Sequence, residues 1–163
     1  MADDHPCDDE LGYGGSKYLM EEMTRLVSRQ NPSLDLINLR ISGIIPDDSP
    51  PVAPPSLENA GSVVAFCRMY MGDMLRCLQL AIENHHKPGV RVLNAVDQYA
   101  VVPDGVTVAS VLRGWWGADA VEAIPGLAAM GDGSVFDTRL AHKEIGFLAQ
   151  RRVAVAEVAT AKL

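Results

Sequence analysis

The chain has 163 residues, of which 48% are apolar and 21% are charged, as in one globular domain with a sizeable core. Its formal net charge of −7 argues against nucleic-acid binding, which needs clustered lysine and arginine. No apolar run reaches the roughly 20 residues that span a bilayer, and the acidic first ten residues are unlike a basic signal peptide. We therefore expect a cytoplasmic protein that binds neither nucleic acid nor membranes.

The cysteines and histidines suggest no disulfide framework and no metal site. Cys7, Cys67 and Cys77 are odd in number and lack CxxC spacing, so reduced thiols are expected. His85-His86 come just before a Pro-Gly stop, where polar or cationic side chains suit a helix C-terminus without any metal. We expect Trp115-Trp116 to serve core and interface packing.

The first predicted element is a helix from near Gly14 to about Gln30, ended by Asn31-Pro32. Its apolar residues recur at helical spacing and predict one buried face: Leu19, Met20, Met23, Leu26 and Val27. Residues 34–41 follow as a strand whose apolar residues are dense enough for a sheet covered on both faces.

A proline-rich loop is predicted from Ser42 to about Leu57. It is followed by a helix over residues 73–83 with Asp73 as a possible N-cap, and by a strand over 90–96. Thr107 is expected to cap a short helix that closes near Gly117, and a further helix is predicted over 138–144. The tail, 150–163, is rich in alanine and valine and could form a frayed or partner-bound helix. This alternation predicts an α/β protein, although two strands make only a marginal sheet.

Tyr13 and Lys17 are the best candidates for chemistry. Their spacing of four places both side chains on one helix face, one turn apart. A phenol has a pKa of about 10, and a neighbouring ammonium favours the phenolate. Such a tyrosine can act as a general acid or base towards a hydroxyl or carbonyl. An ordinary surface tyrosine and lysine on a helix is the alternative.

Several segments resemble, in order, the extended short-chain dehydrogenases/reductases, the NAD-dependent epimerase/dehydratase family. Residues 13–22, YGGSKYLMEE, are similar to the family's YxxSKxxxE active-site helix. Softer similarities follow at LRISGIIP (39–46), YMGDM (70–74), VLNAV (92–96), VTV (106–108) and residues 137–147. Together they cover residues from about 10 to 148.

The resemblance implies an NAD(P)-dependent oxidoreductase, epimerase or dehydratase acting on a small molecule with a hydroxyl or carbonyl, such as a sugar. Tyr13 would be the catalytic acid/base, and Lys17 would bind the nicotinamide ribose and lower the pKa of the tyrosine. The backbone of Ile41, Ser42, Gly43 and Ile44 would lie near the nicotinamide, at the carboxyl end of its strand. The cofactor would be NAD or NADP, and Asp73 would be structural.

The chain also departs from the family pattern. No GxxGxxG or GxGxxG dinucleotide fingerprint is present in the sequence, and only twelve residues precede Tyr13. We therefore expect the C-terminal portion of a Rossmann-like fold without its nucleotide-binding strands. Residues 1–148 would form a partial Rossmann-like domain with the catalytic helix and substrate-binding region, and residues 149–163 a tail.

Two functions follow from this expectation. The chain could be an enzyme that works with a nucleotide-binding partner chain. Alternatively, it could be a non-catalytic, truncated or split-gene domain that acts only by association. In both cases the unpaired edge of the strand at 34–41 predicts a homo-oligomer or a complex with another chain.

Overall fold

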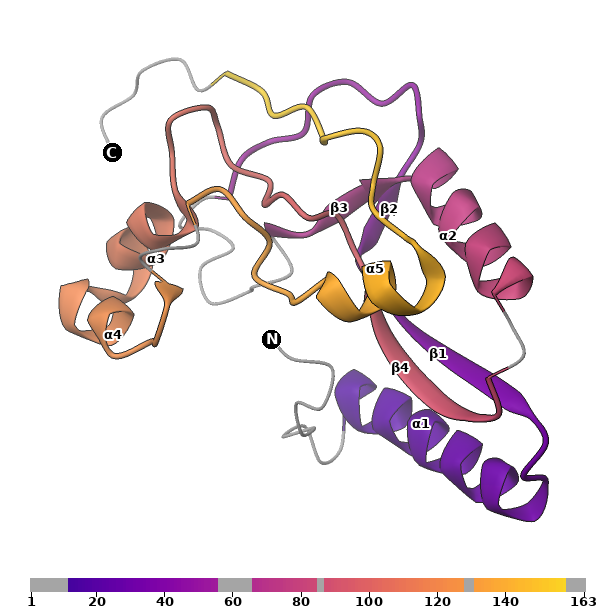
Figure 1. Cartoon of the computed structure of the whole chain (residues 1–163). Helices are drawn as coiled ribbons and strands as arrows, with labels where there is room; N and C mark the ends of the chain where they lie inside the picture. The colour runs from indigo at the N-terminus through magenta and orange to yellow at the C-terminus, as the bar shows by residue number, and fades with distance from the viewer. Residues whose placement is uncertain (1–11, 56–65, 85–86, 128–130, 158–163) are drawn as a thin grey trace.

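The computed structural model describes residues 12–55, 66–84, 87–127 and 131–157. Within these ranges the chain forms a mixed α/β fold with short parallel strands and several helices (Figure 1). In chain order the elements are α1 (Tyr13–Gln30), β1 (Asp35–Ile41), β2 (Gly43–Ile45), β3 (Arg68–Tyr70), α2 (Met71–Glu83), β4 (Gly89–Ala95), α3 (Val108–Trp116), α4 (Ala118–Glu122) and α5 (Arg139–Ile145). No helix in these ranges is long and apolar enough to cross a membrane. The tandem histidines at 85–86 lie outside the described residues.

β1 and β4 pair in parallel along their whole length. Successive side chains of a strand point to opposite faces, and helices cover both faces of this pair (Figure 1). Asn38 and Arg40 bond to side chains of α1, whereas Ile37 and Leu39 pack on the opposite face. This two-sided cover explains why the sequence of β1 is so apolar.

Three clusters of buried side chains form the core of the described residues, and the smallest contains Tyr70, Val101 and Val153. The sheet core joins β1 and β4 to α2 and α5 and contains Met69, Met74, Cys77, Leu93, Ala95, Ala141, Ile145, Phe147 and Ala149. A second cluster, the α3 core, contains Phe66, Cys67, Ala100, Val102, Val108, Ala109, Leu112, Val121 and Leu127. Trp115 packs on this second cluster, with its ring centroid 5.3 Å from that of Phe66, whereas Trp116 lies at the surface.

α1 forms where the sequence predicts it, but its apolar face is not the face that meets the sheet. No α1 residue is buried, and Leu19, Met20, Met23 and Leu26 are 45–63% exposed. The contacts to β1 are polar instead. The Asn38 amide donates to the Thr24 hydroxyl at 2.8 Å, and the Arg40 guanidinium donates to the Glu21 carboxylate at 2.8 and 3.0 Å. The predicted buried face was therefore wrong, because these polar pairs orient the helix.

The prediction that Asp73 caps α2 was also wrong. α2 begins two residues earlier, with Tyr70 at the N-cap position, and the carboxylate of Asp47 accepts the exposed Gly72 N–H at 3.0 Å. Asp73 is buried and accepts the backbone N–H groups of Gln150 and Arg151 at 2.9 and 3.1 Å. The Asp73 carboxylate therefore binds a distant segment of the chain, and Asp47 binds the N–H group at the start of α2.

The region predicted as one long loop contains a short strand. β1 runs through Ser42 into β2, and β2 pairs in parallel with β3 to form a second two-stranded sheet. Three-residue strands carry little periodicity, and their pairing joins residues about 25 positions apart. The sequence pattern therefore did not reveal this sheet.

The described part of the tail is extended, so the helix predicted there was wrong for residues 150–157. Val155 forms an isolated parallel bridge with Val52, and Val153 is buried against Tyr70 and Val101. Alternating valines and alanines suit a half-buried extended chain as well as a helix. The long-range contacts decided between the two.

The capping box of α3 gives a direct test of local helix stabilisation. The Thr107 hydroxyl accepts the Ser110 N–H at 3.1 Å, whereas Thr138 stands at the N-cap of α5 without a side-chain cap bond. We predict that Thr107→Ala lowers the free energy of unfolding by about 1 kcal/mol and that Thr138→Ala changes it by less than half as much. Urea denaturation measures both, and equal losses would contradict the capping role.

Candidate functional site

Tyr13 and Lys17 occupy the first turn of α1. Tyr13 is the first helical residue and is 79% exposed. The Lys17 ammonium nitrogen lies 4.9 Å from the centroid of the Tyr13 ring. Helical spacing therefore brings the two side chains together as expected, with the ammonium over the ring. Gly12 stands at the N-cap position of the helix and has no side chain with which to cap it.

The carboxyl end of β1 lies at the same end of the fold as this pair. Thr24 meets Asn38, and one turn earlier Glu21 meets Arg40. Continuing by four residues along α1, about 6 Å, and by two residues along β1, about 6.6 Å, brings Lys17 level with Ser42. The predicted catalytic pair and the predicted cofactor residues, 41–44, thus gather at one end of the sheet.

The four residues at 41–44 differ in burial and in their contacts. The Ser42 hydroxyl oxygen is buried and has no hydrogen-bond partner among the described residues. A Cβ on Gly43 would lie only 2.9 Å from a guanidinium nitrogen of Arg68, so this glycine permits the arginine to cross the strand. Ile44 packs against the sheet core, whereas Ile41 is 54% exposed. Ser42 therefore has a hydroxyl without a partner among the described residues, and burial closes it to solvent.

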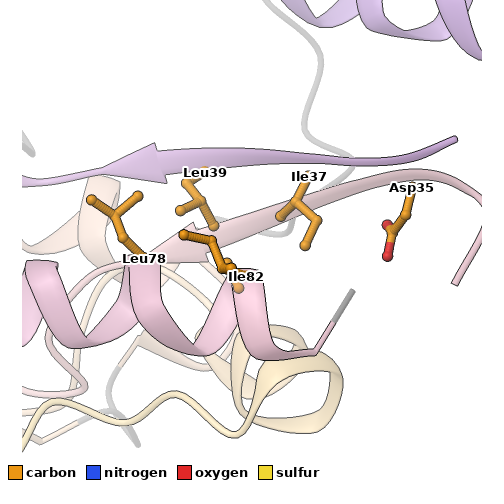
Figure 2. Close-up of a pocket in the computed structure, with 6 residues that line it drawn as sticks. Asp35, Ile37, Leu39, Leu78 and Ile82 are labelled. Carbon is orange, nitrogen blue, oxygen red and sulfur yellow. The ribbon is translucent and has the colours of Figure 1, made fainter. Parts of the chain in front are cut away.

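An apolar groove lies on the other face of the β1–β4 sheet. Asp35, Ile37 and Leu39 of β1 line it together with Leu78, Ala81 and Ile82 of α2. Figure 2 shows the two elements lying side by side with these side chains between them. The groove holds about 400 Å³, but β1 separates it from α1, so the Tyr13–Lys17 pair does not open into it.

Buried thiols do not add a nucleophile to the site. Burial raises the pKa of Cys67 to about 12 and that of Cys77 to about 11, so both stay protonated at neutral pH. Cys7 lies outside the described residues. Among the residues that the structure describes, no three histidine, cysteine or acidic side chains gather as metal ligands.

Asp97 is a buried acid that the sequence reading missed. It follows the carboxyl end of β4, is 3% exposed, and accepts the backbone N–H groups of Tyr99, at 2.9 Å, and of Val153. Burial raises the pKa of this carboxyl to about 6. With Asp73 it anchors residues 150–153 by their backbone. The sequence did show a single acidic residue directly after a predicted strand. The burial of Asp97, however, depends on contact with the tail, which the sequence pattern does not show.

The raised pKa of Asp97 makes stability depend on pH in an unusual direction. The folded protein holds this proton more tightly than the unfolded chain, so the stabilising contribution is complete below pH ~4 and is lost as the pH rises through about 6. We predict that Asp97→Asn gains on the order of 2 kcal/mol relative to wild type between pH 4 and pH 7. Urea denaturation across this range measures it, with the exposed Asp104→Asn as control; parallel curves for Asp97→Asn and wild type would contradict the prediction.

Comparisons with protein families, with curated proteins and with solved structures found no match. The resemblance to the extended short-chain dehydrogenases/reductases therefore stays a prediction from the sequence.

Proposed function

We propose that this chain carries the acid–base half of an NAD(P)-dependent oxidoreductase, epimerase or dehydratase related to the extended short-chain dehydrogenases/reductases. The observation that supports it best is the Tyr13–Lys17 pair, whose ammonium lies 4.9 Å from the ring centroid, at the sheet end where β1 finishes. Open α/β sheets bind ligands beyond the carboxyl ends of their strands. The substrate would be a small molecule with a hydroxyl or carbonyl.

In this proposal the Tyr13 hydroxyl exchanges a proton with the substrate oxygen, and Lys17 holds positive charge beside it. A bound nicotinamide would accept or donate the hydride. The ribose end of that cofactor would meet Lys17, and its nicotinamide would lie near the backbone of residues 41–44. The sequence offers no glycine-rich loop for the pyrophosphate. In the proposal, therefore, a partner chain supplies that contact.

A non-catalytic domain that acts by association is the second candidate. It is favoured by the 79% exposure of Tyr13, because acid–base catalysts work best where water is excluded. The exposed apolar side chains beside β1 also favour this candidate, because such surface is typical of a contact with another protein. The two candidates differ in whether a nicotinamide nucleotide binds at Lys17.

Calorimetric titration with NAD⁺, NADH, NADP⁺ and NADPH separates them. If the chain is an enzyme half with residual affinity, we expect one nucleotide to bind with Kd below about 1 mM and Lys17→Met to weaken that binding at least tenfold. Lys143→Met, an exposed lysine on α5, is the matched control. Absence of heat for all four nucleotides at that concentration would favour the non-catalytic domain.

Tyr13→Phe tests the acid–base role itself. The change removes only the hydroxyl, so nucleotide binding should persist while turnover in a screen of sugars and small carbonyl compounds falls by about 10²- to 10⁴-fold. Tyr18→Phe, five residues along the same helix and also exposed, should leave turnover unchanged. Equal loss in both variants, or none in Tyr13→Phe, would remove Tyr13 from the mechanism.

A further inference from the structure

β1 has a strand on one side only within the described residues. The Gly89 N–H donates to the Leu34 carbonyl at 2.8 Å, which turns the backbone groups of even-numbered β1 residues towards β4. The backbone groups of Ile37 and Leu39 therefore point to the opposite edge. None of the β1 residues is buried, in contrast to the carboxyl half of β4. This edge is a template for a further strand.

Exposed apolar stripes on two helices flank this edge. The α1 stripe consists of Leu19, Met20, Met23 and Leu26, and the α2 stripe consists of Met71, Leu75, Leu78 and Ile82, each 41–71% exposed. The α2 stripe repeats at spacings of four, three and four residues, as in a helix that packs on another helix. Two of its members, Leu78 and Ile82, line the groove beside β1 (Figure 2).

The α1 stripe is turned away from the sheet. Glu21 and Thr24 point at the strand, and at 100° per residue the centre of the stripe lies about 140° around the helix from them. α1 is right-handed and runs antiparallel to β1. The stripe is therefore on the outer side of α1, where it is exposed. Both faces of the open edge are thus bordered by unburied apolar surface.

We propose that β1 pairs with β1 of a second copy of this chain, antiparallel, about a two-fold axis at Asn38. This register overlaps the whole strand and places Ile37 opposite Leu39 of the second copy, so that their outward backbone groups exchange hydrogen bonds. The two sheets then join into one of four strands, in the order β4-β1-β1-β4. The α1 helices meet on one face and the α2 helices on the other.

The helix spacing fits this arrangement. α1 contacts both β1 and β4 and so lies over the line between them, about 4.8 Å from a two-fold axis placed between neighbouring strands. The two α1 helices would then lie about 9.6 Å apart, within the 8–10 Å at which helices pack. The α1 stripes would meet at that contact. Under the two-fold axis, the α1 stripe of one copy contacts the α1 stripe of the other, as an isologous interface requires.

Charge does not oppose this pairing at the strand. Asp35 is bonded to Arg91 at 2.6 Å and Arg40 to Glu21 at 2.8 Å within one chain. In the proposed register Asp35 stands opposite Ile41 and Arg40 opposite Leu36, so no like charges face each other directly. The net charge of −7 per chain adds a weak long-range repulsion that salt screens. A second copy therefore satisfies the backbone, apolar and charge pattern of this edge.

A disulfide test reads the register directly. Asn38 would be a non-hydrogen-bonded pair with itself, with Cα atoms about 4.5 Å apart, which is within disulfide range. Residues 36 of the two copies would be about 13 Å apart, too far to bridge. In a Cys7→Ser background we expect Asn38→Cys to form a covalent dimer in air, and Leu36→Cys on the same strand face not to. Circular dichroism confirms that each variant is folded.

Sedimentation velocity of the unmodified chain gives the independent readout. We expect a dimer at about 10 μM, with Met23→Glu and Leu75→Glu each raising the dissociation constant at least tenfold because each places a charge in an apolar contact. Ile124→Glu, an exposed apolar residue beyond these stripes, should leave it unchanged. A monomer at about 100 μM, a dimer that resists both stripe variants, or equal cross-linking at residues 36 and 38 would overturn the proposal. A complex formed only with a different protein would overturn it as well.

Discussion

The parallel pairing of β1 with β4 is the interaction on which the rest of this fold depends. It joins residues more than fifty positions apart and presents one face to α1 and the other to the sheet core. Two strands alone make a marginal sheet in water. The pair is stable here because Leu93 and Ala95 of β4 are fully buried in the sheet core. At its amino end, Asp35 and Arg91 close an ion pair in which both side chains are less than 10% exposed.

Carboxylates then attach the outer segments to this centre. Asp73 and Asp97 accept backbone N–H groups from residues 150–153, and Asp47 accepts Gly72 while pairing with Arg151 at 2.8 Å. Hydrogen bonds to charged acceptors are stronger than neutral ones, and a buried acid without them would be costly. The extended tail is therefore held by specific polar contacts as much as by apolar burial. This arrangement gives acids a structural role in a fold with few strands.

The candidate site and the open edge of β1 are separate features with one origin. Both lie along β1, which pairs with one other strand among the described residues. The Tyr13–Lys17 pair stands on the α1 face, whereas the groove lies on the α2 face. Association of two copies through β1 would bury the apolar stripes without using either side chain of the pair. The proposed interface and the proposed chemistry can therefore be tested independently.

The sequence by itself determined where the main elements lie. Helical periodicity predicted α1 and α2, the dense apolar run predicted β1, and Thr107 marked the start of α3, because each of these signals is local. The four-residue spacing likewise determined that Tyr13 and Lys17 share a helix face. Only the tertiary structure decided which surfaces are buried. The α1 stripe is exposed because Glu21 and Thr24 bind β1. Asp73 accepts the backbone N–H of Gln150, and Asp47 instead accepts an N–H at the start of α2. The tail is extended because Val155 pairs with Val52. Each outcome depends on a partner far away in the chain, which no local pattern encodes.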